Sequence, residues 1–311
     1  MTRNLEKVLV TGGAGFIGSH LVDKLVNDGY EVTVLDNLST GNLENIKAHL
    51  NRASFRFVKG DIRDIQTIRA ASKNAKSIFH LAAITSVPFS IENPEITMEV
   101  NLNGTKNLLE NAALNRVEQF IYVSSCAVYG NPVYLPVDEK HPTNPKSPYG
   151  ASKLRAEQEC IKFGEKCGFR TTILRLFNVY GPRQRCGDYG GVMAQFINKL
   201  RNNEPPIIYG DGSQTRDFIH INDVIKAFIL ALKDKNTSGG SIFNIASGKP
   251  TSINELAQVL IDLLGSKQVK PEHLKARRGD IKYSYADIKK AQTTLGFKPK
   301  ISLKEGLSTL L

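Results

Sequence analysis

A glycine-rich segment directly after the first apolar run restricts the folds open to this chain. Residues 7–11 are apolar and β-branched, and the sequence Thr-Gly-Gly-Ala-Gly-Phe-Ile-Gly occupies residues 11–18. A helical spacing of apolar residues begins there. Glycines in such a turn allow a tight bend, close approach of the backbone to a pyrophosphate, and close packing of helix on strand. The segment therefore predicts a βαβ unit with an anion site at the helix N-terminus.

Strand and helix patterns alternate through the first half of the chain. Further apolar, β-branched runs lie at residues 31–36, 55–59, 77–81, 119–124 and 170–176. Helical spacing separates most of them, most clearly at residues 93–115 and 148–166, and Gly168 suits the end of the second helix. This alternation predicts an α/β protein with a Rossmann doubly wound parallel sheet.

The pattern changes after residue 176, where proline- and glycine-rich stretches become frequent. Binding loops are commonly built from such stretches. We therefore expect residues 1–177 to form an NAD-binding Rossmann domain. Residues 178–311 are expected to form mainly a smaller C-terminal α/β domain that binds substrate, with some segments returning to the sheet.

Composition excludes several other classes of protein. The net charge is +11 over 311 residues, but the basic residues are dispersed, which favours small anionic substrates over nucleic acid. The four cysteines form no C-x-x-C pair, so neither a disulfide framework nor a metal site is indicated. The chain has no apolar run near the ~20 residues of a membrane span. We expect a cytoplasmic protein without membrane or nucleic-acid partners.

Asp36 ends the second predicted strand, ~20 residues beyond the glycines, where an acid can bind ribose hydroxyls. Its charge would repel a 2′-phosphate, and residues 37–41 contain no arginine to bind one. The predicted cofactor is therefore NAD and not NADP.

Tyr149 and Lys153 lie one turn apart in the second helical stretch, and Ser125 follows a predicted strand. An ammonium beside a phenol is expected to lower the phenol pKa from ~10 toward neutrality. Tyr149 would then accept a hydroxyl proton while hydride leaves to NAD, and Ser125 would hydrogen-bond the same hydroxyl. Tyr285 and Lys289 repeat the spacing, which we interpret as accidental.

Ten motifs in order give the chain a family resemblance. They are TGGAGFIGSH, VLDNLSTG, GDIRD, HLAA, NLNGT, SSCAVYG, YGASK, LRLFNVYGPRQ, RDFIHINDV and RRGDIKYSYADI. The chain resembles extended short-chain dehydrogenase/reductases of the NAD-dependent epimerase/dehydratase family, and it is most similar to UDP-glucose and UDP-N-acetylglucosamine 4-epimerases. The motifs cover nearly its whole length.

The resemblance implies roles for individual residues. The catalytic residues would be Ser125, Tyr149 and Lys153. Besides Tyr149 and Lys153, the NAD contacts would be Gly12, Gly15, Phe16, Ile17, Asp36, Asn37, Ser39, Thr40, Gly41, Asp61, Ile62, Leu81, Ala82, Ala83, Asn101 and Phe177. Besides Ser125 and Tyr149, the nucleotide-sugar contacts would be Asn178, Arg216, Arg277, Asp280 and Ser284. Two arginines suit a diphosphate, because the guanidinium fork matches phosphate oxygens.

Departures from the family pattern distinguish its branches. The 4,6-dehydratases carry Asp-Glu where this chain has Cys126 and Ala127, and the UDP-glucuronate decarboxylases carry glutamate in place of Ala127. Neither residue here can supply that acid or base. The family's usual glutamine after HLAA is replaced by Ile84 in this chain.

The resemblance predicts a 4-epimerase that works through a 4-keto sugar with transient hydride transfer to bound NAD. In similar epimerases the position of Ser284 lines the sugar pocket, and serine is small. Both UDP-glucose/UDP-galactose and their N-acetylated counterparts are therefore expected substrates. The alternative is that Ser284 serves loop packing while Tyr283 fills the pocket. UDP-glucuronate 4-epimerase is the alternative activity, and a non-catalytic NAD-sensing regulator the alternative class. A homodimer through the helices at 93–115 and 148–166 is implied.

Overall fold

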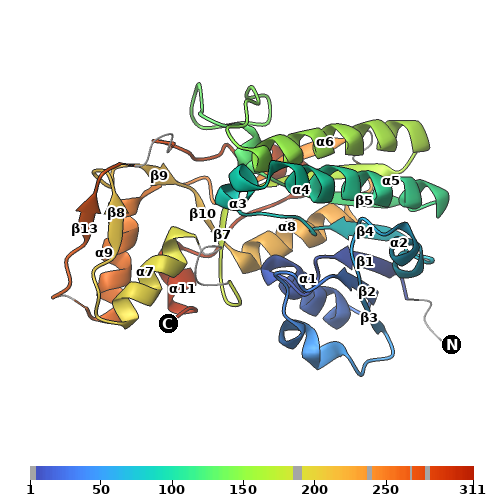
Figure 1. Ribbon diagram of the computed structural model, residues 1–311, viewed down its shortest axis with the longest axis horizontal. Helices are drawn as coiled ribbons and strands as arrows, with labels where there is room; N and C mark the ends of the chain where they lie inside the picture. The colour runs from blue at the N-terminus through green and yellow to red at the C-terminus, as the bar shows by residue number, and fades with distance from the viewer. Residues whose placement is uncertain (1–4, 185–190, 237–239, 267, 277–280) are drawn as a thin grey trace.

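The computed structural model describes residues 5–184, 191–236, 240–266, 268–276 and 281–311. Within these ranges, seven parallel strands form one sheet in the order β11-β6-β5-β4-β1-β2-β3 (Figure 1). The strands are β1 (Lys7–Thr11), β2 (Glu31–Asp36), β3 (Phe55–Lys59), β4 (Ser77–His80), β5 (Gln119–Ser125), β6 (Arg170–Leu176) and β11 (Ser241–Ile245). The predicted doubly wound parallel sheet is confirmed.

The order of the strands creates a crevice at one edge of the sheet. From β1 the chain continues outward to β2 and β3, and it then crosses back to β4 on the other side of β1. The loops that follow β1 and β4 therefore diverge at the carboxyl edge, which is where ligands bind in sheets of this kind.

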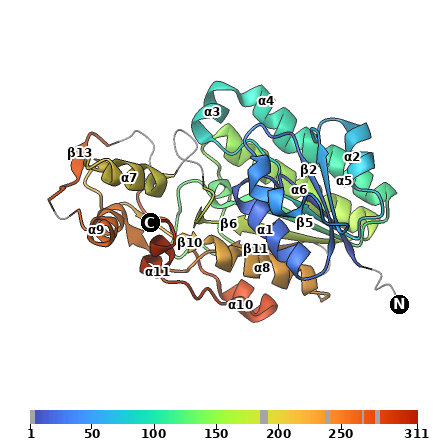
Figure 2. The same ribbon diagram turned by 90° about the horizontal axis from the view of Figure 1, so that it is seen from below.

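Helices cover both faces of the sheet (Figure 2). On one face, α1 (Phe16–Asn27) and α8 (Ile221–Lys233) pack through buried side chains such as Leu21 and Phe228. On the other face, α2 (Ile65–Ala71), α5 (Gly104–Leu114) and α6 (Pro148–Cys167) pack through side chains such as Ile68, Leu108 and Cys160. The sheet is thus shielded from water on both sides, which suits its continuous apolar strands.

The helix α6 has defined ends. The Ser147 hydroxyl accepts a hydrogen bond from the Gly150 backbone N–H at 3.1 Å, which satisfies one donor of the first turn. Gly168 ends the helix in the left-handed conformation, with φ of 78°, as the sequence predicts.

The continuous helix expected at residues 93–115 is interrupted. The chain forms α3 (Val87–Glu92), α4 (Pro94–Met98), a π-helical turn (Glu99–Asn103) and α5. The π turn turns the buried Asn101 toward the backbone of Ile84, with which it exchanges two hydrogen bonds. Such turns are frequent at functional sites, and apolar periodicity does not reveal them.

A smaller unit lies at one end of the sheet, on the left in Figure 1. It contains the helices α7 (Val192–Arg201), α9 (Ile253–Leu264) and α11 (Leu303–Ser308). It also contains two short strand pairs: β8 (Ile207–Tyr209) pairs with β13 (Glu272–Leu274), and β9 (Thr215–Arg216) pairs with β12 (Thr251–Ser252). Its own core includes Phe196, Leu256 and Leu307. The pair of β7 (Asn178–Tyr180) and β10 (Phe218–His220) lies between this unit and the large sheet (Figure 1).

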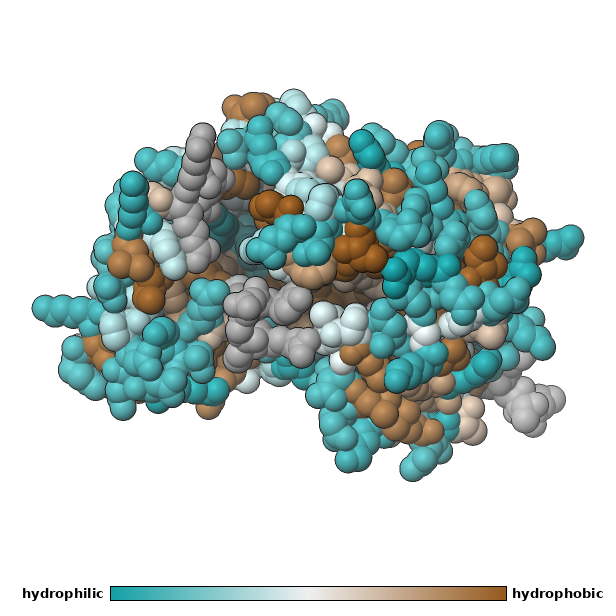
Figure 3. Space-filling model, in the orientation of Figure 1, coloured by the Kyte–Doolittle hydropathy of each residue, from teal (hydrophilic) through white to brown (hydrophobic). Residues whose placement is uncertain are grey.

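The surface is polar over much of the face in Figure 3, with scattered apolar residues. No helix in the described ranges is long and apolar enough to span a membrane.

The helix α10 (Lys289–Leu295) packs beside β11 and α8, so the chain beyond residue 177 contributes both to the sheet and to the helices that cover it.

Candidate functional site

The glycine turn after β1 is in close contact with the loop that follows β4 and with α1. Gly12 has φ of 70°, and a Cβ there would lie 2.8 Å from the backbone N of Ala82. A Cβ on Gly18 would lie 2.1 Å from the carbonyl oxygen of Gly12. The N-cap of α1 is Gly15, which has no side chain to bind the first N–H groups of the helix. These donors and the helix dipole suit a pyrophosphate, so the turn fits a dinucleotide.

Asp36 lies beside this turn, at the end of β2. Its carboxylate accepts hydrogen bonds from the backbone N–H groups of Ala14 at 2.9 Å and Leu38 at 2.8 Å. Burial raises the pKa of Asp36, and these two bonds oppose the shift. A Cβ on Gly41 would lie 2.8 Å from an oxygen of Asp36, so glycine is required where the loop crosses the carboxylate.

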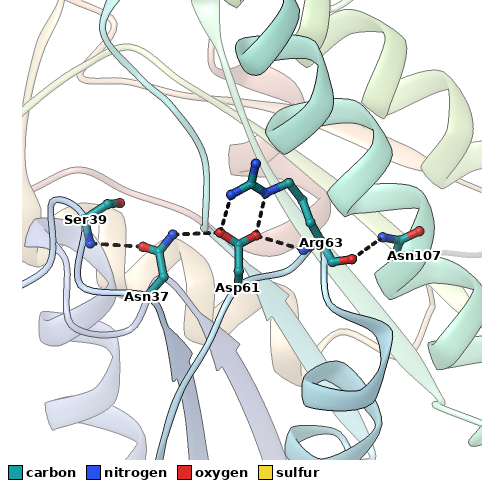
Figure 4. Close-up of polar contacts among 5 residues, drawn as sticks. All are labelled: Asn37, Ser39, Asp61, Arg63 and Asn107. Atoms are coloured by element: carbon teal, nitrogen blue, oxygen red, sulfur yellow. Dashed lines mark hydrogen bonds and ion pairs between the residues drawn. The ribbon is translucent and has the colours of Figure 1, made fainter.

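A polar cluster extends the site from β2 to β3 (Figure 4). The amide of Asn37 donates to Asp61 at 3.0 Å and accepts from the backbone N–H of Ser39 at 3.0 Å. Arg63 binds the carboxylate of Asp61 with two nitrogens, each at 2.9 Å. The Arg63 hydrogen bond lowers the pKa of Asp61 to about 2. Arg63 was not predicted as a site residue, although the GDIRD motif contains it.

The remaining predicted cofactor residues lie at the same edge of the sheet or support it. Ile62 is buried against Gly104, where a Cβ would lie 2.7 Å from its side chain. Phe177 is buried in a cluster with Val128 and Tyr129. The others occupy the first turn of α1 and the loops that follow β2 and β4; these are Phe16, Ile17, Ser39, Thr40, Leu81 and Ala83.

Asn101 is engaged within the protein. Its side chain accepts from the Ile84 N–H at 2.8 Å and donates to the Ile84 carbonyl at 2.9 Å. It also donates to the hydroxyl of Ser152 at 3.0 Å, and Ser152 donates to the carbonyl of Tyr149 at 2.8 Å. Asn101 therefore connects the loop after β4 to the first turn of α6.

The three predicted catalytic residues meet where β5 ends against α6. Ser125 is the last residue of β5, and Tyr149 and Lys153 lie one turn apart on α6. Burial raises the pKa of Tyr149 to about 12, and a side-chain hydrogen bond with Ser125 opposes this shift. Burial lowers the pKa of Lys153 to about 8.

The pKa of Tyr149 is raised in this structure, and not lowered as the sequence predicted. The ammonium of Lys153 donates to the carbonyl of Val123 at 2.7 Å and lies 4.7 Å from the ring centroid of Tyr122. It is thus directed at the backbone of β5, and the burial of the phenol dominates its pKa. Spacing on a helix places two residues on one face, but it does not fix where a long side chain ends.

Three of the predicted substrate residues, Asn178, Arg216 and Ser284, lie in segments that contact one another. Arg216 in β9 donates to the carbonyl of Ile281 at 2.6 Å. Burial raises the pKa of the Cys126 thiol to about 11, and the charge of Arg216 opposes this shift. Asn178 begins β7, and Ser284 is buried. Arg277 and Asp280 lie outside the described residues.

Residues 8–246 match the model of the NAD dependent epimerase/dehydratase family. The chain belongs to this family. Membership of the NAD-dependent epimerase/dehydratase family makes it an NAD-dependent enzyme, as the glycine turn and Asp36 predicted.

Relatives and solved structures of the family match along nearly the whole chain. A putative UDP-glucose 4-epimerase of Methanocaldococcus jannaschii is 44% identical, over 98% of this chain and 97% of the relative. A UDP-glucuronic acid decarboxylase 1 of Xenopus tropicalis is 34% identical, over 98% of this chain and 71% of the relative.

Among structures, UDP-glucose 4-epimerase of Thermotoga maritima with UDP-glucose has a TM-score of 0.91 and 38% identity, covering 97% and 96% of the two chains. UDP-N-acetylglucosamine 4-epimerase of Methanobrevibacter ruminantium with UDP-N-acetylmuramic acid has a TM-score of 0.92 and 37% identity, covering 98% of each.

Proposed function

We propose that this family member is a UDP-hexose 4-epimerase, which interconverts UDP-glucose with UDP-galactose and UDP-N-acetylglucosamine with UDP-N-acetylgalactosamine. The observation that carries the proposal is the position of Tyr149, hydrogen-bonded to Ser125 and one turn from Lys153, beside the crevice that the glycine turn opens. The relatives named as 4-epimerases support it.

In the proposed reaction, Tyr149 takes the proton of the sugar O4 hydroxyl, and Ser125 hydrogen-bonds that oxygen. NAD, when bound, supplies the acceptor and the returning donor of the C4 hydride. In this reaction Lys153 turns its ammonium from the carbonyl of Val123 toward Tyr149 and stabilises the ionised phenol by its charge. Arg216 binds the diphosphate while the 4-keto sugar turns about its phosphate linkage, and Tyr149 then returns the proton to O4.

The residues after Ser125 favour epimerisation over the other reactions of the family. Burial raises the pKa of Cys126 to about 11, so its thiol stays protonated at neutral pH. Ala127 has no titratable group. Neither residue can perform the acid-base step that elimination of water or loss of carboxylate requires at this position.

The first test incubates the purified protein with UDP-glucose without added NAD and monitors the formation of UDP-galactose by NMR. UDP-glucuronate serves as the comparison substrate, because the basic surface would also accept a C6 carboxylate. A higher kcat/KM for UDP-glucose supports the proposal, and a higher value for UDP-glucuronate would establish the alternative activity.

The pH dependence of kcat/KM follows from the two shifted pKa values. The active form of the pair has lost one proton, because Tyr149 must be ionised while Lys153 stays charged. The pKa of Lys153 is about 8 and that of Tyr149 about 12, so the fraction with ionised Tyr149 and charged Lys153 increases with pH up to about 8 and is then constant up to about 12. We expect kcat/KM to rise with pH up to about 8 and to stay level above it. Rates from pH 6 to 10 in a constant-ionic-strength buffer measure this, and a decrease between pH 6 and 8 would contradict the assignment.

Ser284 is proposed to leave room for the 2-acetamido group. It is buried, whereas the neighbouring Tyr283 is 45% exposed with the ammonium of Lys282 5.4 Å from its ring centroid, which argues against Tyr283 filling the sugar pocket. Ser284→Tyr is expected to lower kcat/KM for UDP-N-acetylglucosamine by about 10- to 100-fold, with little effect on UDP-glucose. Parallel assays of the two substrates measure the ratio, and equal losses would refute the role of Ser284.

The homodimer and the cytoplasmic location stay predictions. An exposed apolar side chain on one of the predicted dimer helices supports the proposal, since Leu114 in α5 is 73% exposed. Sedimentation velocity at micromolar concentration tests the dimer, and a monomer there would contradict it.

A further inference from the structure

The carboxylate of Asp217 is a buried acceptor for four hydrogen bonds. Asp217 lies between β9 and β10, and its exposed fraction is 0%. One oxygen accepts from the backbone N–H of Ser247 at 2.8 Å and from its hydroxyl at 2.6 Å. The other accepts from the N–H groups of Gly248 at 3.0 Å and Ala286 at 3.2 Å. Because an ionised carboxylate only accepts, this set of donors suits aspartate and no neutral isostere.

These donors come from segments that are far apart in sequence. Ser247 and Gly248 follow β11, the edge strand of the large sheet, and Ala286 lies two residues beyond Ser284. The main-chain oxygen of Asp217 also accepts from the backbone N–H of Asn178 at 3.0 Å and from its side-chain amide at 3.2 Å.

The segment that carries Ser284 is attached at both ends. Before Ser284, the carbonyl of Ile281 accepts from Arg216, and the carbonyl of Lys282 accepts from the N–H of Thr215 at 2.8 Å. After Ser284, the N–H of Ala286 binds Asp217. Val137 also pairs with this end, since its N–H donates to the carbonyl of Tyr285 at 2.9 Å and its carbonyl accepts from the N–H of Asp287 at 2.8 Å. Removing the Asp217 contact would therefore loosen the segment between Ser284 and β9, while Val137 still held Tyr285 and Asp287.

We propose that Asp217 is a positioning residue for the nucleotide sugar: it holds Asn178, Arg216 and the segment of Ser284 in one arrangement at the end of β11. The proposal rests on the proposed function, because it takes these three residues as the substrate contacts. Asp217 does not itself touch the substrate in this account.

Asp223 offers a matched control for loss of a buried carboxylate. It is 1% exposed at the start of α8, accepts from the N–H groups of Lys300 at 2.8 Å and Ile301 at 2.9 Å, and pairs with Lys226. These contacts attach the C-terminal segment to α8, and none of its partners is a proposed substrate contact. Asp223→Asn should therefore weaken the fold without moving the sugar site.

The experiment compares Asp217→Asn with Asp223→Asn as purified holoenzymes. Asn keeps one acceptor oxygen but turns an amide N–H₂ toward N–H donors. Asp217→Asn is expected to raise KM for UDP-glucose and the calorimetric Kd of UDP by about tenfold or more, with kcat changed by less than about threefold. Asp223→Asn is expected to lower the Tm while KM and Kd stay within about twofold of wild type.

Unchanged KM and Kd in Asp217→Asn would overturn the proposal, and so would equal increases in both variants, since those would indicate general loosening. If Asp217→Asn does not fold, Ser247→Ala decides, because it removes one donor and leaves the others. A rise in Kd of about threefold then supports the proposal, and an unchanged Kd overturns it. Wild-type turnover of UDP-glucose is measured alongside, so failure of the proposed function is seen separately from failure of UDP positioning.

Discussion

Replacement of Tyr149 by Phe is expected to lower kcat by about 10²- to 10⁴-fold, the range that a positioned general acid or base contributes. The change removes one oxygen from a side chain that packs at the start of α6. Its hydroxyl is hydrogen-bonded to Ser125, so the loss falls on proton transfer at O4. KM for UDP-glucose should change little, because the proposed diphosphate contact at Arg216 is untouched.

Tyr285→Phe is the matched control. Tyr285 and Lys289 repeat the spacing of the catalytic pair, but α10 begins at Lys289, so Tyr285 is outside the helix and the two do not share a helix face. This variant should keep kcat within about twofold of wild type. Initial rates, NAD content and Tm are measured for both variants. Unchanged turnover in Tyr149→Phe would remove this tyrosine from the mechanism, and no turnover by the wild type itself would favour a non-catalytic NAD-binding role.

The second large effect is expected at the buried ion pair of Glu157 and Arg175. The side chains are 2% and 4% exposed, and two hydrogen bonds of 3.0 and 2.7 Å join them. The hydroxyl of Ser124 also donates to Glu157, directly before the catalytic Ser125. Glu157→Leu would leave the guanidinium buried without a counter-charge, and among the described residues its Nη1 already has no hydrogen-bond partner.

We therefore expect Glu157→Leu to lower the free energy of unfolding by about 3–5 kcal/mol. The double variant Glu157→Leu/Arg175→Met replaces both charges with apolar groups and should recover most of this loss. Urea unfolding of the three proteins at one NAD concentration gives the comparison. A loss below about 1 kcal/mol in the single variant, or no recovery in the double variant, would contradict this account of the pair.

The sequence was sufficient for the features set by local geometry. The parallel sheet follows from apolar runs separated by helical spacing. Glycine at position 12 predicted a tight turn, and its φ there is positive, which few other residues adopt. The end of α6 at Gly168 was predicted for the same reason. These features depend on a few neighbouring residues, so spacing alone identifies them.

Features that depend on contacts distant in sequence were not predictable in this way. The π turn that carries Asn101 comes with two hydrogen bonds from its side chain to Ile84, 17 residues earlier in the chain. Arg63, by contrast, binds Asp61 from two residues along the chain, so the GDIRD motif itself could have indicated it. The four donors on Asp217 come from two other segments, which no local pattern relates.

The central claim is that a hydride leaves C4 and returns to the same carbon. The direct measurement is NMR of UDP-N-acetylglucosamine incubated with the purified protein in D₂O, without added NAD, followed at the anomeric and C4 positions. The account predicts UDP-N-acetylgalactosamine that retains protium at C4, because the hydrogen that leaves as hydride does not exchange with water. Deuterium at C4, or no conversion of any UDP-hexose, would contradict it.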